Sequence, residues 1–476
     1  MHLINSTKRC EYDGVVIGSG PNGLAAAIAL ARAGRSVLVL EAHEQIGGGV
    51  RSRALTLPGF THDVCSAVHP MAAASPFLRS LPLHEHGLEW IHPPYCLAHP
   101  LDEGAAVLDH SIEKTCQILG SDANAYRRLV GTLAKNWSLL ENSILSPLRF
   151  PSRPLLMARF GLHAIQPASQ LAKSSFKSEP ARALFAGLAA HSLMPLERWG
   201  TSAIGLVLAA LAHVVGWPIA KGGSQRIADA LAAYLRSLGG KIVTGVRVHS
   251  QKELPPSRLV LCDLSPRGLL QIAGESLPLG YRRALERYEY GPGVFKIDWA
   301  LRAPIAWTAP QCAQAGTVHL GGTLVEIARS ERESCGTQHP ERPFVLLSQP
   351  SLFDPTRAPK GCHTAWAYCH VPSGSKRDMT SCIETQVERF APGFRELILA
   401  RSARSPEQLE AENSNLVGGN ITGGANSLRQ LFFRPTSGFY KTPVKGLFLC
   451  SASTPPGGGV HGMCGYHAAM QALANF

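Results

Sequence analysis

No C-x-x-C pair occurs in the chain, although it has 12 cysteines among its 476 residues. A redox dithiol and a structural zinc site both need cysteines at such a spacing, so the sequence argues against both. His84, His86, His92 and His99 have no cysteine or carboxylate at ligand spacing, and we predict no metal site. The cysteines therefore indicate buried thiols in a reducing compartment.

The chain also lacks an apolar leader and any run of basic residues. Its N-terminal segment, MHLINSTKRCEYD, is polar where a signal peptide needs an apolar core, so we predict a cytoplasmic protein that is not secreted. The formal charge of +12 suits nucleic acid, an anionic membrane surface or an anionic cofactor as partner. Because the lysines and arginines are scattered, without interleaved aromatic residues, we expect no nucleic-acid partner.

One apolar run approaches the length of a membrane span. It covers residues 201–220, TSAIGLVLAALAHVVGWPIA, and contains Gly205, His213, Gly216 and Pro218. These residues, and the lack of a topogenic flanking loop, predict a wholly buried helix instead. The chain is longer than a typical single core, so we expect two domains.

Residues 14–52, GVVIGSGPNGLAAAIALARAGRSVLVLEAHEQIGGGVRS, carry the strongest motif. The branched run at 15–17 predicts a strand buried on both faces. An alanine-rich helix follows, ended by Gly34, and residues 37–40 predict a second buried strand. This order of elements predicts the start of a doubly wound α/β domain of the Rossmann type.

Four residues of this motif have physical roles in dinucleotide binding. Gly18 permits the tight strand-to-helix turn, Gly20 lets the backbone approach a pyrophosphate, and Gly23 lets the helix lie close to the sheet. The helix N-terminus offers unpaired N–H donors to phosphate. Glu41 lies 18 residues beyond Gly23, where a carboxylate accepts the ribose hydroxyls and disfavours a 2′-phosphate. The alternative is a doubly wound domain with an empty site.

A second glycine cluster distinguishes FAD from NAD as the expected cofactor. Gly47 and Gly48 are followed by Gly49, Arg51 and Ser52, which a nicotinamide site does not require. The cluster resembles the glycine doublet of the glutathione-reductase-like and amine-oxidase-like flavoproteins, which passes the FAD pyrophosphate. Many of these proteins continue with arginine where this chain has Gly49, which leaves open whether Arg51 takes over that contact. We predict FAD contacts at Gly47, Gly48, Arg51 and Ser52.

Two later segments are expected to return to the same domain. A helix over 224–238 and strands over 241–248 and 258–263 follow one another, and in this kind of flavoprotein a valine there contacts the adenine, here Val248. Near the C-terminus we predict a strand over 447–450, a glycine loop at 457–459 and a helix opening near Val460. Its N–H donors would face the flavin pyrimidine edge through Gly458, Gly459 and Val460. The alternative is a C-terminal packing helix.

With these motifs, the chain resembles the phytoene desaturase family of FAD oxidoreductases, in the branch related to pyridine nucleotide-disulphide oxidoreductase domain-containing protein 2. Further matching segments are GPGVFKIDWAL (291–301), QPSLFDPTRAP (349–359), AWAYCHVP (365–372) and STPPGGGVHGMCGYHAA (453–469). The resemblance implies a discontinuous FAD-binding domain interleaved with an α+β substrate domain. The expected segments are 10–75, 220–275 and 420–476 for the first and 76–219 and 276–419 for the second.

Three residues are candidates for the chemistry. The alternation in VFKIDWAL places Lys296 and Asp298 on one face of a strand, which on an edge strand would simply be the solvated side. Resemblance to amine-oxidase-fold flavoenzymes implies that Lys296 lies near flavin N5. His461 in the C-terminal glycine loop is the best acid–base candidate, and a histidine bonded in a helix cap is the alternative.

The first functional hypothesis is hydride transfer between FAD and an apolar unsaturated substrate of isoprenoid or polyene type. The sequence leaves the electron acceptor open, with oxygen and a quinone as candidates. One alternative is an amine-oxidase-like enzyme, which an aromatic cage including Trp366 and Tyr368 would support. Another is a non-catalytic prenyl-binding protein like the Rab GDP-dissociation inhibitors. The segment 145–186 intersperses basic and apolar residues, which indicates either a peripheral membrane contact or a solvated helical face. The basic residues are Arg149, Arg153, Arg159, Lys173, Lys177 and Arg182.

Overall fold

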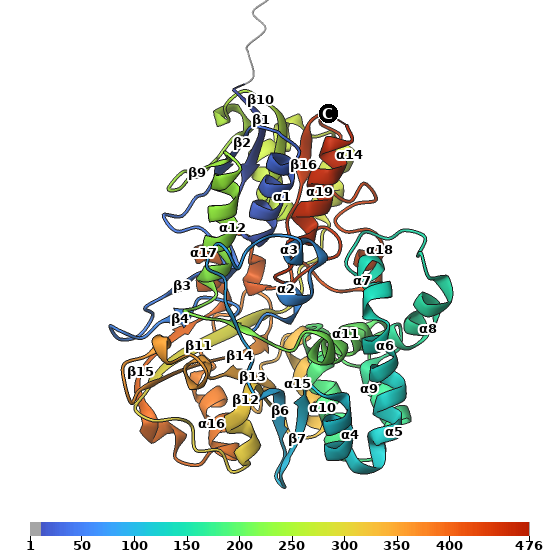
Figure 1. Ribbon diagram of the computed structural model, residues 1–476, viewed down its shortest axis with the longest axis vertical. Helices are drawn as coiled ribbons and strands as arrows, with labels where there is room; N and C mark the ends of the chain where they lie inside the picture. The colour runs from blue at the N-terminus through green and yellow to red at the C-terminus, as the bar shows by residue number, and fades with distance from the viewer. Residues whose placement is uncertain (1–10, 476) are drawn as a thin grey trace, which may run out of the picture.

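The computed structural model describes residues 11–475, so most of the polar N-terminal segment on which the secretion argument depends lies outside the described residues. Two large sheets and a group of helices make up the molecule (Figure 1). The smaller sheet lies at the top of the view in Figure 1, the larger sheet at the lower left, and helices α4 to α11 at the lower right.

The upper sheet has five strands in the order β16-β10-β1-β2-β9, and every neighbouring pair is parallel. This sheet confirms the predicted Rossmann-like fold. Its apolar residues are buried on both sides, beneath helices α1, α12 and α19 on one face and α13 and α14 on the other. The strands are β1 (Tyr12–Ile17), β2 (Val37–Leu40), β9 (Lys241–Val243), β10 (Ser257–Cys262) and β16 (Leu447–Leu449). The helices are α1 (Pro21–Arg32), α12 (Gln225–Ser237), α13 (Pro266–Ala273), α14 (Leu279–Glu286) and α19 (Met463–Leu473).

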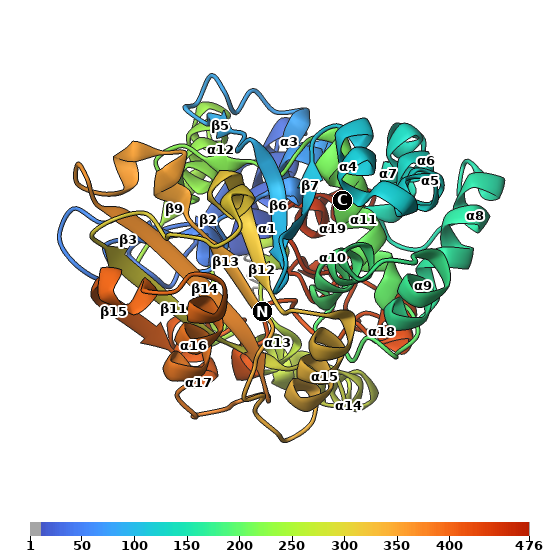
Figure 2. The ribbon, with the colours of Figure 1, turned by 90° about the horizontal axis from the view of Figure 1, so that it is seen from below.

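The lower sheet has seven strands in the order β15-β11-β14-β13-β12-β6-β7, mostly antiparallel, and Figure 2 shows it from below. Helix α16 packs against the face seen there, over an apolar cluster that includes Phe295, Ile297 and Trp299. The opposite face, with Lys296 and Asp298, is turned toward the rest of the molecule. The strands are β6 (Tyr95–Pro100), β7 (Ala105–Asp109), β11 (Gly293–Leu301), β12 (Ala315–Leu320), β13 (Val345–Ser348), β14 (His363–Val371) and β15 (Ile398–Arg404).

A helical layer lies beside the lower sheet. Its helices are α4 (Ile112–Leu119), α5 (Ala123–Tyr126), α6 (Thr132–Lys135), α7 (Trp137–Ile144), α8 (Pro154–Ala164), α9 (Ala168–Ser175), α10 (Glu179–Ala190) and α11 (Thr201–Val214). Residues 201–214 of the apolar run form α11, most of whose residues are buried, whereas the predicted helix does not continue to residue 220, because residues 219–220 form β8. Within residues 11–475, no helix combines the length and hydropathy that crossing a bilayer requires.

Shorter elements connect these layers. They are β3 (Ser52–Arg53), β4 (His62–Asp63), β5 (Trp90–Ile91), β8 (Ile219–Ala220), α2 (Pro70–Ala74), α3 (Pro76–Arg79), α15 (Leu324–Cys335), α16 (Thr380–Phe390), α17 (Pro406–Glu412) and α18 (Leu428–Phe432). All cysteines of the described residues are free thiols.

Two further predicted element boundaries are wrong. The strand expected over 241–248 ends at Val243, because the chain turns at Gly245, whose φ is +71°. The helix expected near Val460 begins at Met463 instead. Gly462 adopts φ +67° immediately before it, a left-handed conformation that a continuing helix cannot include.

Candidate functional site

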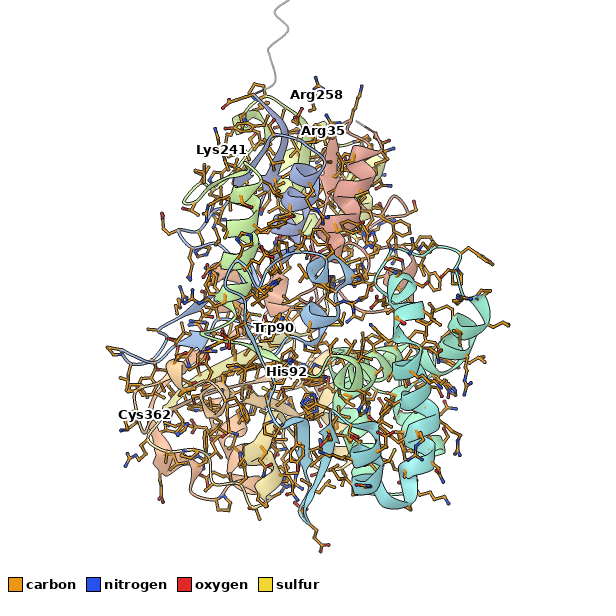
Figure 3. All side chains as sticks on the ribbon, viewed as in Figure 1. Arg35, Trp90, His92, Lys241, Arg258 and Cys362 are labelled. Atoms are coloured by element: carbon orange, nitrogen blue, oxygen red, sulfur yellow. The ribbon has the colours of Figure 1, made fainter. Side chains whose placement is uncertain are left out.

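One cavity of about 1170 Å³ extends through the centre of the molecule. It begins at the carboxyl ends of β1, β2 and β10 and continues to the lower sheet and to helices α8 and α11. Figure 3 labels Lys241 and Arg258 at the top, at the amino ends of β9 and β10, so the cavity lies at the opposite end of the parallel sheet. Ligands of open α/β sheets bind outside the carboxyl ends of the strands, which is where this cavity starts.

The first glycine turn lies at this end of the cavity. Gly18 and Gly20 line it, and α1 begins at Pro21 with its N-terminus toward it. Gly23 does not line the cavity, because it faces the turn itself. A Cβ at Gly23 would lie 2.1 Å from the Gly18 carbonyl oxygen, so only glycine lets α1 pack this close.

The second glycine cluster packs directly against the first. A Cβ at Gly48 would lie 3.2 Å from the Cα of Gly20, and the Gly47 N–H donates to the Ser19 carbonyl at 3.1 Å. Gly48 lines the cavity, whereas Gly47 lies behind it. Gly20 and Gly48 are therefore adjacent in the cavity wall, and the bare backbone of both clusters faces a ligand that lies over them.

Arg51 and Ser52, the two side chains predicted beside this cluster, differ in their surroundings. Arg51 lines the cavity, its Nε donates to the Gly48 carbonyl at 3.0 Å, and burial lowers the pKa of its guanidinium. Its Nη2 lies 3.5 Å from the Glu412 carboxylate. Ser52 is outside the cavity lining and donates to Asp63 Oδ1 at 2.6 Å. Its hydroxyl therefore bonds to Asp63 and does not face the cavity, and the cofactor contact of Ser52 stays a prediction.

Glu41 lies at the end of β2 with its carboxylate held in one orientation. Its Oε2 accepts from the Ser19 N–H and hydroxyl at 2.9 and 2.6 Å, and its Oε1 accepts from the His43 N–H at 2.9 Å. The carboxylate lines the cavity and keeps further acceptor capacity. Val248 also lines this end, from the irregular segment after β9.

Asp263 is a cavity residue to which the sequence assigned no role. It follows β10, and its Oδ2 accepts from the Gly23 N–H of the first turn of α1 at 2.9 Å. Burial and, to a smaller extent, the negative charge of Glu41 raise the pKa of this carboxyl to about 7, although the hydrogen bond from Gly23 acts in the opposite direction. An acidic residue directly after the fourth strand of the sheet in chain order was the available signal.

The C-terminal glycine loop contributes backbone to the cavity and a capped helix behind it. Gly458, Gly459 and Val460 line the cavity. His461 is fully buried, its Nδ1 accepts from the Met463 N–H at 3.0 Å, and its Nε2 donates to the Gly457 carbonyl at 3.1 Å. Burial lowers the pKa of His461 to about 4. Both ring nitrogens bond to backbone and the ring is neutral at pH 7, so His461 caps α19 while it also lines the cavity, and its acid–base role stays a prediction.

Lys296 and Asp298 form a buried ion pair on β11. Lys296 Nζ donates to Asp298 Oδ2 at 2.5 Å, and the two residues are 2% and 0% exposed. Strand β11 lies between β15 and β14, so the alternative of a solvated edge strand is wrong. Burial raises the pKa of Asp298, and burial together with the charge of Lys296 lowers the pKa of the adjacent His62 to about 3.

Two aromatic rings separate this ion pair from the cavity. Lys296 Nζ lies 5.5 Å from the centroid of the Trp366 ring, and Trp366 lines the cavity with Tyr368. Lys296 and Asp298 are not part of the lining. The two rings are stacked, with centroids 5.6 Å apart and planes 7° apart. The ammonium group therefore acts on the cavity through the face of Trp366.

The half of the cavity beyond these rings is apolar. Arg434 is its one charged lining residue among those described, and its guanidinium donates to the carbonyls of Ala452 and Thr422 and to Asn426 Oδ1. The apolar lining includes Leu145, Met157, Phe160, Ile204, Val207, Leu208, Trp217, Leu346, Leu428 and Phe432.

Comparisons with known proteins agree with this arrangement. Residues 16–81 match the family model described as NAD(P)-binding Rossmann-like domain. Phytoene desaturase (lycopene-forming) of Pseudescherichia vulneris is 26% identical over 94% of this chain and 96% of its own length, which confirms the resemblance to that family. Among solved structures, an oxidoreductase from Methanosarcina mazei (TM-score 0.66, 18% identity, 97% of this chain and 99% of the other) and wild-type putrescine oxidase bound to putrescine (TM-score 0.63, 16% identity, 97% and 99%) have the same fold.

Two mammalian relatives match the chain over nearly its full length. Pyridine nucleotide-disulfide oxidoreductase domain-containing protein 2 of Rattus norvegicus is 30% identical over 98% of this chain and 94% of its own length. The Mus musculus protein of the same name is also 30% identical, with the same coverage of both chains. With its Rossmann-like dinucleotide-binding domain, the chain is an oxidoreductase that belongs to the family of pyridine nucleotide-disulfide oxidoreductase domain-containing protein 2.

Proposed function

We propose that the protein binds FAD and transfers hydride between the flavin and an apolar unsaturated substrate. The observation that carries this proposal is the continuity of one cavity, which joins the two glycine clusters and Glu41 to a wall of apolar side chains. A dinucleotide bound at one end would have its reactive ring directed toward the other.

The residues at the nucleotide end fit FAD. Gly20 and Gly48 place bare backbone side by side in the cavity wall, where a pyrophosphate can lie over both, beside the N-terminus of α1. Glu41 is oriented to accept ribose hydroxyls, and Val248 is placed for an apolar contact with adenine. When bound, the flavin supplies a group that accepts or releases hydride.

The chain's own residues would contribute orientation, charge and exclusion of water. The Lys296 ammonium, buried behind Trp366, favours negative charge in the adjacent part of the cavity. The apolar lining keeps that region dry, which strengthens the electrostatic effect of the ion pair. Gly458 and Gly459 offer backbone to the flavin edge without a side chain between.

The cavity favours an apolar substrate over an amine. A protonated amine needs a carboxylate or an open aromatic cage, and the substrate half has no carboxylate among its described lining residues. At 5.6 Å between centroids, Trp366 and Tyr368 leave no room for a group between their rings. The oriented Glu41 and the two packed glycine clusters favour a dinucleotide enzyme over a prenyl-binding protein without a cofactor.

Helix α8 supports a contact with an anionic membrane. Phe150, Leu155 and Leu162 are 88%, 86% and 69% exposed, with exposed Arg149 and Arg159 nearby, while other residues of α8 line the cavity. The helix lies at the right edge of the molecule in Figure 1. This surface would admit a lipid from the bilayer. Replacing Leu155 and Leu162 by serine should reduce sedimentation with phosphatidylserine vesicles, and unchanged sedimentation would exclude this surface.

The visible spectrum of the purified protein, with mass spectrometry of the group released on denaturation, tests the cofactor. We expect flavin bands and FAD for the wild type and colourless protein for Gly20→Val, with the exposed Gly280→Val on α14 as the matched control. Anaerobic bleaching of the bands by polyenes but not by amines would support the apolar substrate. A colourless wild type that takes up no added FAD would overturn the proposal and favour the prenyl-binding alternative.

A further inference from the structure

Three of the uncharged polar residues that line the apolar half of the cavity carry the inference. His191 and Ser192 follow the C-terminal end of α10, and Thr317 lies on β12, and all three line the cavity. We call them the polar cluster. Its members come from different layers of the fold, and β12 places Thr317 and His319 on the same face of the lower sheet, two residues apart.

The hydroxyls of the polar cluster have no protein partner. Ser192 Oγ and Thr317 Oγ1 are buried and make no hydrogen bond within residues 11–475. Ser192 is held in place through its carbonyl, which accepts from Asn426 Nδ2 at 3.0 Å. A buried polar atom without a partner costs free energy, so such atoms in a cavity wall indicate a ligand that supplies the missing bonds.

His191 adds a ring nitrogen to this surface. Its Nε2 lies 3.1 Å from His319 Nε2, so one ring donates to the other, and no hydrogen bond within the described chain uses its Nδ1. Burial lowers the pKa of His191 to about 3 and that of His319 far below its usual value. Both rings are therefore neutral at pH 7, and His191 can donate or accept but brings no charge.

The polar cluster itself brings no charge to a ligand. Among the described residues, the lining of this half has no carboxylate, so a cationic ligand group would be buried without a counter-ion, which is strongly unfavourable. The charged lining residue of this half is Arg434, whose Nε, Nη1 and Nη2 each donate one bond to a protein acceptor. The hydroxyls of Ser192 and Thr317 and the neutral ring of His191 match a hydroxyl or carbonyl group.

We propose that the substrate is not a pure hydrocarbon but an apolar chain with one uncharged oxygen function, a hydroxyl or carbonyl, which Thr317, Ser192 and His191 bind. The inference rests on the proposed apolar substrate and makes it more specific. It assigns a specificity-determining role to the polar cluster, while the apolar walls bind the remainder of the chain.

A matched pair of probes tests this inference. Geranylgeraniol and the hydrocarbon that has a methyl group in place of its CH₂OH would be delivered from detergent micelles to the purified full chain. Quenching of tryptophan fluorescence reports binding, because Trp217 and Trp366 line the cavity. Thr317→Val removes the orphaned hydroxyl at nearly constant volume. Thr364→Val is the matched control, since Thr364 Oγ1 is also buried and unpaired but lies outside the cavity lining.

We expect the wild type to bind the alcohol about tenfold more tightly than the hydrocarbon, as one to two hydrogen bonds would provide. Thr317→Val should weaken alcohol binding about fivefold and leave hydrocarbon binding unchanged, and Thr364→Val should change neither. The inference would be overturned by equal affinities of the wild type for the two probes, or by an equal loss of affinity for both in Thr317→Val. Either result would still be compatible with the proposed apolar substrate. Binding of neither probe would overturn both.

Discussion

Replacing Asp263 by asparagine should stabilise the protein increasingly as the pH rises. The folded protein holds this carboxyl with a pKa of about 7, against a usual value of 3.8, because burial disfavours its charged form. An acid with a raised pKa binds its proton more tightly in the folded state. The contribution of this proton to the free energy of unfolding is fully present below pH 3.8 and is lost as the pH rises through 7.

The two pKa values give the size of the effect. Integrating the linkage between pKa 3.8 and about 7 gives a destabilisation of about 2 kcal/mol at pH 5 and about 4 kcal/mol at pH 8. Asparagine does not ionise, and its amide oxygen can still accept the hydrogen bond that Asp263 Oδ2 receives from the Gly23 N–H. The free energy of unfolding of Asp263→Asn, relative to that of the wild type, should therefore grow by about 2–3 kcal/mol between pH 5 and pH 8.

Urea unfolding of the wild type and Asp263→Asn from pH 5 to pH 8, at matched dinucleotide occupancy, measures this difference. Asp229→Asn, at a partly exposed position on α12 outside the cavity lining, is the control for the same chemical change elsewhere in the chain. Parallel pH profiles for wild type and Asp263→Asn would refute the reasoning, because they would mean that Asp263 ionises alike in the folded and unfolded chain.

Three other substitutions test the packing and the charges of the site. Gly23→Ala should lower stability by about 1–3 kcal/mol, because its Cβ would overlap backbone, whereas Gly280→Ala, with open space around it, should not; thermal unfolding compares them. Lys296→Met should lower the free energy of unfolding by about 3–5 kcal/mol, because it leaves Asp298 buried and unpaired. Adding Asp298→Asn should restore most of this free energy, which a double-mutant cycle in urea measures. His461→Asn should keep its rate of substrate oxidation from pH 6 to pH 8, because its oxygen can still cap α19; a rate loss beyond tenfold would support an acid–base role for this residue.

The nucleotide end of the site was predictable because its signals are local. Gly18, Gly20 and Gly23 occur within six residues, and the strand on either side of the helix is a short branched run, so periodicity and glycine spacing predict the turn. The contact between Gly20 and Gly48 could be expected only through resemblance, since nothing local to residues 47–49 shows what they pack against.

The rest of the site depends on pairings that no local pattern contains. The alternation in 294–301 places Lys296 and Asp298 on one face, but whether that face is solvated depends on β14 and β15, which are about 70 to 100 residues away. The neighbours of Ser52 in the sequence predicted that it contacts the cofactor. In the folded chain its hydroxyl donates to Asp63 and accepts from the Gln225 N–H, and tertiary structure brings both residues to it.

The two sheets explain why most of the charged lining residues lie at one end of the cavity. The upper sheet meets the cavity with the ends of its strands, and the lower sheet meets it with one face. The parallel sheet brings the carboxyl ends of its strands to one edge, so Glu41 and Asp263, each the first residue after a strand, lie together there with the N-terminus of α1. The lower sheet instead presents the flat face of β12, β13 and β14, on which a side chain reaches the cavity only at every second position. On β14 these positions hold Trp366 and Tyr368, and the ion pair of β11 lies on the next strand behind them. Ionised groups can therefore meet a polar cofactor at one end of the cavity while the other end remains suited to an uncharged molecule.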